Sequence, residues 1–193
     1  PAFVGRLIKA ANGVVGENGR SVVSVQDALM VLGLPAVRAM ALGFSLLSNY
    51  RKGACAAFDY ARFWTSSVLM ALSMQALARR LRVIPADDAF SVGLLARIGE
   101  LALATIYPAD FGLVLRKVAA AADARQLDLE QAAFAMTHCE LGAAMLSDWG
   151  IPAQLFNPVR FFEMPEYAGF PEGSREAGLM QCLILSRAIA QLC

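Results

Sequence analysis

Apolar residues recur along most of this chain at steps of three and four positions, which is the spacing of one face of an α-helix. The alternation of apolar and polar residues that marks a strand is almost absent. The longest helix is predicted over residues 58–82. Its predicted buried stripe consists of Ala61, Trp64, Val68, Leu72 and Ala76. We therefore predict an all-α fold, built as a multi-helix bundle.

Capping residues and prolines divide this pattern into separate helices. Thr137 and Glu140 have the spacing of a capping box, in which each side chain accepts a backbone N–H of the other residue. Gly33 is a predicted stop, and Gly99 is a predicted break in the helix that begins at Pro85. The other predicted helix starts are Ser24, Pro35, Pro108, Asp128, Pro152 and Ser174. The last helix is predicted to be still running at Cys193.

The 193 residues are enough for one domain with a substantial core. A connector over residues 51–57 is predicted to separate an N-terminal helical lobe, residues 1–50, from a second lobe, residues 56–193, within a single domain. The first residue is Pro1 and not methionine, so we expect a fragment of a longer protein.

The composition excludes some classes of function. The formal net charge of +1 and the lack of a Lys/Arg run argue against a nucleic-acid-binding protein. The most apolar window, residues 28–48, is interrupted by Pro35 and Arg38, so we predict no membrane span. Isolated cysteines in an apolar chain are typical of core thiols in a reducing compartment, which favours the cytoplasm. These cysteines are Cys55, Cys139, Cys182 and Cys193.

The stretch from Gly93 to Gly99 reads Gly-Leu-Leu-Ala-Arg-Ile-Gly and resembles the Gly-Leu-Leu-His-Asp-Ile-Gly motif of the HD superfamily. In that superfamily the adjacent His and Asp hold a metal ion that activates water. Ala96 and Arg97 stand at these two positions, so the frame of the motif is present without its ligands.

Further segments, in the same order along nearly the whole chain, resemble an HDOD domain, a branch of the HD superfamily found in bacterial signalling proteins. Residues 1–12 are similar to its opening segment, residues 63–67 to Phe-Trp-x-His-Ser, and residues 137–143 to Asp-His-x-x-Val-Gly-Ala. The resemblance implies an HD-like helical core with an N-terminal helical lobe. The positions of the vestigial HD site are Ser66, Ala96, Arg97, His138, Phe161 and Phe162.

The resemblance therefore predicts a chain without catalytic residues, metal ligands or cofactor, because a methyl group or a phenyl ring cannot bind a metal and Arg97 would repel a cation. We expect a non-catalytic signalling module that docks partner proteins or an adjacent domain, or relays conformational change. HDOD domains often accompany receiver, GGDEF or EAL domains. The alternative is a sensor of a nucleotide or cyclic dinucleotide, with Arg97 and His138 as candidate contacts.

A metal-dependent phosphohydrolase is the third reading, and it would need ligands from residues such as Asp87, Asp88 or Asp148. Simpler explanations are favoured for both candidate contacts. Arg97 is expected to form a salt bridge with Glu100, Asp87 or Asp88, or to be exposed. The other candidate, the imidazole of His138, is expected to be half buried at a capped helix start that disfavours its charged form.

Overall fold

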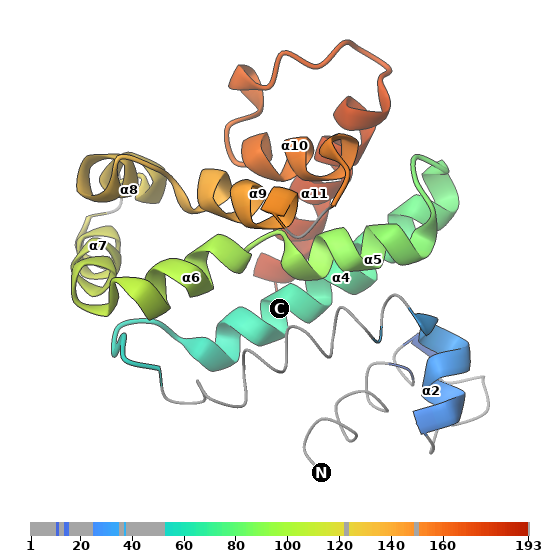
Figure 1. Cartoon of the computed structure of the whole chain (residues 1–193), viewed down its shortest axis with the longest axis horizontal. Helices are drawn as coiled ribbons and strands as arrows, with labels where there is room; N and C mark the ends of the chain where they lie inside the picture. The colour runs from blue at the N-terminus through green and yellow to red at the C-terminus, as the bar shows by residue number, and fades with distance from the viewer. Residues whose placement is uncertain are drawn as a thin grey trace.

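The computed structural model describes residues 11, 14–15, 25–34, 37, 53–121, 124–148 and 151–192. These residues are mainly helical and contain no strand, which confirms the all-α prediction (Figure 1). The elements are α2 (Val25–Leu32), α4 (Tyr60–Leu81), α5 (Ala86–Leu95), α6 (Ile98–Ile106), α7 (Pro108–Ala120), α8 (Gln126–Phe134), α9 (His138–Asp148), α10 (Ala153–Phe161), the 3₁₀ turn η1 (Pro165–Tyr167) and α11 (Arg175–Gln191).

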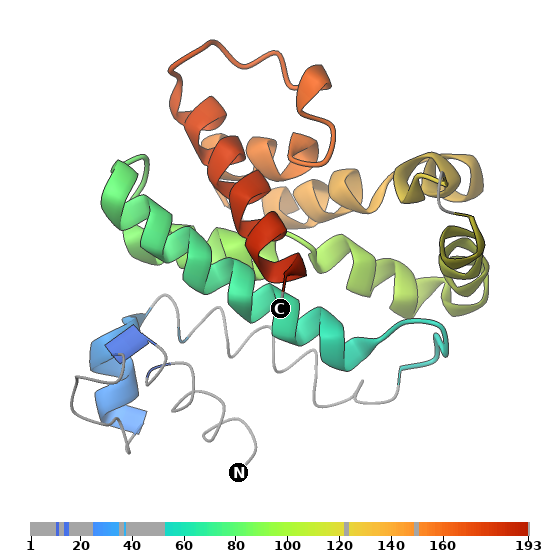
Figure 2. The same ribbon diagram turned by 180° about the vertical axis from the view of Figure 1, so that it is seen from behind.

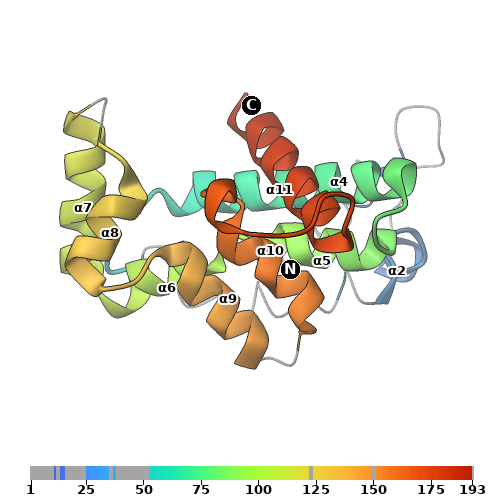
Figure 3. The same ribbon diagram turned by 90° about the horizontal axis from the view of Figure 1, so that it is seen from above.

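An antiparallel pair of helices, α4 and α5, lies at the centre of the fold (Figure 1). The last helix, α11, crosses α4 on the other side (Figure 2). Helices α7 and α8 lie at one end of the molecule and α2 lies at the other (Figure 3). Helix α9 contacts both α6 and α10, and α10 in turn contacts α11.

Two glycines of the central motif allow this packing. A Cβ atom on Gly93 would lie 2.9 Å from the Cα of Ala71, which is closer than side chains tolerate, so glycine lets α5 lie directly against α4. A Cβ atom on Gly99 would overlap the backbone carbonyl oxygen of His138. The start of α6 therefore lies against the start of α9, and residues near Gly99 and His138 are brought together.

Apolar side chains on both sides of the central pair form the core. One cluster joins α4, α5 and α11 through residues such as Met74, Leu95 and Leu183. Another joins the start of α4 to α6 and α7 through Phe63 and Phe111. Three of the cysteines, Cys55, Cys139 and Cys182, are buried and free, which agrees with the prediction of core thiols; Cys193 lies outside the described residues.

The predicted buried stripe of α4 is wrong. Ala61 and Ala76 are exposed, and Trp64, Val68 and Leu72 are only partly buried. The buried face consists of Phe63, Ser67, Met70, Ala71, Met74, Gln75 and Ala78. The hydroxyl of Ser67 donates to the carbonyl oxygen of Phe63 at 2.8 Å, so this polar residue is satisfied within its own helix and can be buried.

Most helix boundaries agree with the capping signals, and three differ. The break in the central motif falls at Ala96 and Arg97, before Gly99. Helix α8 begins at Gln126, two residues before Asp128. Helix α11 ends at Gln191, earlier than predicted, and Cys193 itself lies outside the described residues. Gly33 ends α2 with a φ of 82°, as predicted. The predicted starts at Ser24 and Pro35 lie outside the described residues.

The N-terminal part that the structure describes packs on the central pair, because Ala28 and Leu32 of α2 share an apolar cluster with Phe90 and Leu94 of α5. The division into lobes at residues 1–50 and 56–193 stays a prediction. Among the described residues, the stretch Ala86–Ile106 is long and apolar enough to cross a membrane, but 72% of its most apolar window is buried inside the fold. It is therefore explained as core.

Candidate functional site

A polar cavity of about 500 Å³ lies between the first half of α4, the starts of α6, α8 and α9, the loop after α10, and the end of α11. Ser66, Arg97 and His138 line it, so the structure brings together three of the six vestigial positions. The other three do not line it. Ala96 and Phe162 are buried in the core, and the ring of Phe161 packs on Phe170 with centroids 6.0 Å apart.

Arg97 and Glu100 form a bidentate ion pair in the cavity wall. The Nε of Arg97 donates to Oε1 of Glu100 at 2.6 Å, and Nη2 donates to Oε2 at 2.7 Å. Burial alone lowers the pKa of Arg97, but the Glu100 carboxylate outweighs it, and the pKa of this guanidinium lies above its ordinary value. Of the partners considered for Arg97, the structure therefore selects Glu100, three residues ahead at the start of α6.

His138 is buried, with 2% of its surface exposed. Its Nδ1 lies 2.8 Å and 3.0 Å from the two carboxylate oxygens of Glu130, and its backbone N–H donates to Oε2 of Glu130 at 2.8 Å. Glu130 is itself fully buried and accepts a further hydrogen bond from the Gln126 side chain at 2.8 Å. This geometry places a proton on Nδ1 and directs Nε2 into the cavity.

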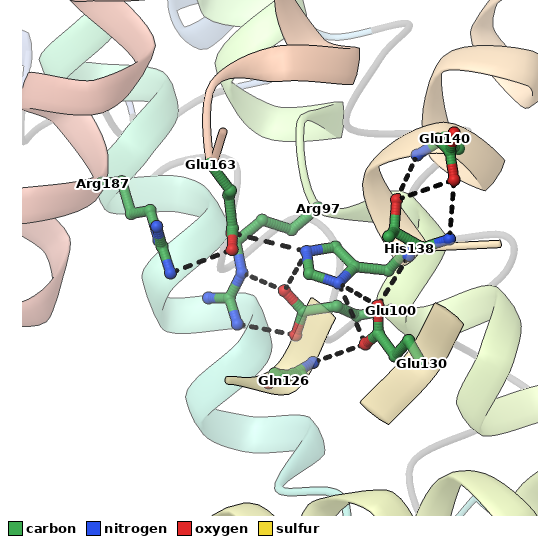
Figure 4. Close-up of polar contacts among 9 residues, drawn as sticks. Arg97, Glu100, Gln126, Glu130, His138, Glu140, Glu163 and Arg187 are labelled. Carbon is green, nitrogen blue, oxygen red and sulfur yellow. Dashed lines mark hydrogen bonds and ion pairs between the residues drawn. The ribbon is translucent and has the colours of Figure 1, made fainter. Parts of the chain in front are cut away.

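The other ring nitrogen, Nε2, faces two more carboxylates. It lies 3.4 Å from Oε1 of Glu163 and 3.6 Å from Oε1 of Glu100. Glu163 comes from the loop after α10, and its second oxygen lies 3.1 Å from Nη2 of Arg187 on α11. The side chains thus alternate in charge across the cavity, from Arg97 through Glu100, His138 and Glu163 to Arg187 (Figure 4).

This network favours the charged form of His138. Burial of the ring lowers its pKa, but the Cys139 side chain and hydrogen bonds to Glu130 and Glu163 outweigh burial, and the pKa of His138 lies well above its ordinary value. Burial raises the pKa of Glu163, but the His138 ring and Arg187 outweigh it and hold that pKa below its ordinary value. The expected half-buried imidazole is wrong, because only 2% of His138 is exposed, and the direction of its pKa shift opposes the expected uncharged form.

The capping box at the start of α9 is confirmed. The backbone N–H of Thr137 donates to Oε2 of Glu140 at 2.9 Å, and the backbone N–H of Glu140 donates to Oγ1 of Thr137 at 3.2 Å. These bonds fix the first turn of α9, which carries His138. Glu140 does not line the cavity and also pairs with Arg160 at 3.3 Å. Its role is to position the helix start.

Among the residues that the structure describes, the group that could hold a metal ion is His138, Cys139 and Glu163, whose ligand atoms lie within 4.8 Å of one another. Two features of this site oppose a divalent cation. The nearby Glu100 is already held by the Arg97 fork, and Glu163 is paired with Arg187, so two guanidinium groups face the same space. The Ala96 methyl group supplies no ligand. This donor set therefore does not fit the catalytic metal of an HD phosphohydrolase.

Sequence reasoning missed Glu130, Glu163 and Arg187 as members of the site. Glu130 and Glu163 contact His138 from 8 and 25 positions away, and no local motif marks them. One general rule could have indicated that such residues exist: a histidine that is buried in an apolar chain must find polar partners. The predicted ligand positions near Phe161 and Phe162 are close in sequence to Glu163, which is the residue that enters the cavity.

Comparison with known proteins agrees with this all-α fold. The HDOD domain family model matches residues 1–165. A solved structure of the MmoQ response regulator from Methylococcus capsulatus str. Bath is 35% identical, with a TM-score of 0.67, over 99% of this chain and 73% of that chain. No curated protein sequence matches this chain at a significant level.

Two further solved structures share the fold at lower identity. An HDOD domain protein of unknown function from Geobacter sulfurreducens is 19% identical with a TM-score of 0.75, over 98% of this chain and 62% of that chain. A Shewanella amazonensis SB2B protein, provisionally named a phosphohydrolase, is 22% identical with a TM-score of 0.69, over 99% of this chain and 76% of that chain. At these identities the likeness supports the fold alone.

Proposed function

The chain belongs to the HDOD family, and we propose that it is a non-catalytic bacterial signal-transduction module that works in the cytoplasm. In this proposal the module docks partner proteins or an adjacent signalling domain, or relays conformational change to them. The similarity to a protein named as a response regulator, at 35% identity, supports a role in signalling.

The observation that carries the non-catalytic part is the ion pair of Arg97 with Glu100. The HD motif places a metal-binding Asp where Arg97 stands, and here a fixed cation occupies that position with its own carboxylate partner 2.6 Å away. Together with Arg187 and with His138, whose raised pKa favours its charged form, it supplies internally the positive charge that a metal would supply in an HD enzyme. Such a network stabilises the centre of the fold and offers no activated water.

Hydrolysis of a phosphodiester tests this proposal. The protein is incubated with bis-p-nitrophenyl phosphate and with cyclic dinucleotides in the presence of Mn²⁺ or Fe²⁺, against a blank of metal alone. We expect no rate above that blank. A metal-dependent, saturable rate that is lost in the Glu163→Gln variant would contradict the proposal, because it would mean that this site turns over substrate.

A second experiment tests the signalling part. In the source bacterium, loss of a signalling module is expected to change the transcript profile without accumulation of one phosphorylated metabolite. The control is a strain that carries the gene with Arg80→Gln, an exposed substitution outside the cavity. Accumulation of a single phosphoester with an unchanged transcript profile would instead point to a metabolic enzyme.

A small-ligand sensor is the second candidate, and the cavity itself favours it. A cavity of about 500 Å³ falls in the range of small-molecule sites, which is about 300–1,000 Å³. A ligand that binds only the folded state must raise its apparent stability, so a thermal-shift experiment with nucleotides separates a sensor from a pure docking module.

A further inference from the structure

The arginines of the cavity fall into two groups. Arg97 pairs with the carboxylate of Glu100, and Arg187 pairs with that of Glu163. The charge of each of these arginines is therefore balanced within the protein. Arg62 and Arg125 also line the cavity, and they are different. The Arg62 side chain has no ion-pair partner among the described residues, and Arg125 lies only at 3.9 Å from an exposed Asp128. These two arginines are therefore available to a ligand.

The two available arginines come from different elements that meet at the cavity. Arg62 lies in the first turn of α4, and Arg125 is the N-cap residue of α8. Both side chains are exposed, whereas the Glu100, His138 and Glu163 side chains of the ion-pair network are buried, with 7%, 2% and 7% exposed. An anion entering the cavity would meet Arg62 and Arg125 first.

The balance of charge in the cavity also favours an anion. Four arginines and His138 line it, against the carboxylates of Asp59, Glu100 and Glu163 in the wall and of Glu130, which is bonded to His138 behind the wall. The first turn of α8 adds to this balance, because Gln126 and Leu127 line the cavity and no side chain caps this helix start. Uncapped N–H groups at a helix start favour phosphate oxygens, and the planar fork of arginine matches them.

The size and the apolar part of the cavity limit the ligand. Phe58, Phe63 and Leu115 form part of its wall, so a ligand can place an apolar or aromatic group beside its charged group. A volume of about 500 Å³ is sufficient for a mononucleotide and far larger than a single phosphate ion needs.

We infer that this cavity binds a phosphate-bearing small molecule of mononucleotide size, with Arg62 and Arg125 as the phosphate contacts and with the internal ion pairs of Arg97 and Arg187 left intact. This inference deepens the sensor alternative of the proposed function and rests on it. It differs from the sequence-based expectation, which assigned the contacts to Arg97 and His138, because both of those side chains are held by carboxylates of the protein itself.

The test is isothermal titration of the whole chain with 5′-GMP, 5′-AMP and inorganic pyrophosphate, with guanosine as the uncharged control. We expect saturable binding of at least one nucleotide, none of guanosine, and weakening with added NaCl. The Arg62→Gln and Arg125→Gln variants should each raise the Kd about tenfold or more, since each removes one charged hydrogen-bond donor. Arg80→Gln, an exposed substitution on the same helix as Arg62, should leave the Kd unchanged.

Two results would overturn the inference. One is the absence of heat and of thermal shift with every probe at millimolar concentration while the wild-type protein is folded. The other is equal weakening by Arg62→Gln, Arg125→Gln and Arg80→Gln, which would mean that only overall charge matters. Analysis of the nucleotide recovered after the titration tests the binding inference and the non-catalytic function separately. An intact nucleotide supports both, whereas release of phosphate would contradict the non-catalytic function and leave the binding site standing.

Discussion

Nδ1 of His138 lies 2.8 Å from a carboxylate oxygen of Glu130, and both side chains are buried, with 2% and 0% of their surfaces exposed. Both side chains are almost fully buried, so their hydrogen bonds depend on partners inside the protein, and each is the nearest charged partner of the other. The pair also links α8 to the start of α9, since Glu130 accepts the backbone N–H of His138.

Removing one member of this pair is predicted to destabilise the fold strongly. Glu130→Gln keeps the shape of the side chain and removes its charge, and we expect a loss of about 3–5 kcal/mol in the free energy of unfolding, as for other broken buried ion pairs. Urea unfolding measures the loss. Asp128→Asn, an exposed substitution on the same helix, is the matched control and should change stability by less than about 0.5 kcal/mol. Equal, small effects of both substitutions would contradict the buried charge pair.

The pH dependence of stability follows from the raised pKa of His138. A histidine whose folded pKa exceeds its unfolded value of about 6.5 contributes its full stabilisation below that pH and loses it as the pH rises through the folded pKa. We therefore expect the free energy of unfolding to fall as the pH rises above about 6.5, and this slope to be reduced in His138→Gln.

Nuclear magnetic resonance measures the protonation of the His138 ring directly as the pH is changed. The chain has one histidine, so its ring signal needs no assignment. The ring proton signal is expected to titrate well above the ordinary pKa of histidine. A midpoint at or below about 6.5 would mean that the ring is neutral in the folded protein at neutral pH.

Gly99 gives a prediction about how the site is assembled. Because a Cβ atom there would overlap the carbonyl oxygen of His138, Gly99→Ala must push α6 away from α9, and we expect a loss of about 3 kcal/mol or more. Gly112→Ala is the control, since the nearest atom to its Cβ would be 3.5 Å away in ordinary contact. That substitution lies within α7 and should leave stability unchanged or raise it by up to about 1 kcal/mol. Thermal unfolding compares the two.

A double-mutant cycle measures the ion pair of Arg97 and Glu100. Glu100 has 7% of its side chain exposed, so Arg97→Ala leaves a buried carboxylate with only the His138 ring nearby at 3.6 Å, and we expect a loss of about 2–4 kcal/mol. Removing both side chains should be less destabilising than the sum of the single substitutions, with a coupling of about 1–3 kcal/mol. Strict additivity would mean that the pair contributes little to the site.

The features that the sequence predicted well are local ones. Prolines and capping residues set helix starts through bonds within one turn, and Pro108, Thr137 and Ser174 therefore mark α7, α9 and α11 correctly. The frame of the central motif also has a local signal, since its glycines and leucines are adjacent. The all-α class follows from a periodicity that extends over most of the chain.

The features that the sequence did not predict depend on tertiary contacts. The buried face of α4 includes Ser67 and Gln75, and a pattern search that counts only apolar residues passes over them. The charge of His138 depends on Glu130 and Glu163, which other elements carry to the ring. Periodicity describes which face of a helix is buried, but it does not say which distant side chain meets that face.

The measurement that tests the central claim most directly is the metal content of the purified protein, by elemental analysis after purification without chelators. The claim is that Arg97, Arg187 and protonated His138 supply the positive charge of the vestigial HD site. We predict less than about a tenth of an equivalent of iron, manganese, zinc or magnesium per chain. A content close to one equivalent, lost in Glu163→Gln and retained in Asp128→Asn, would contradict this account and assign a metal to the site.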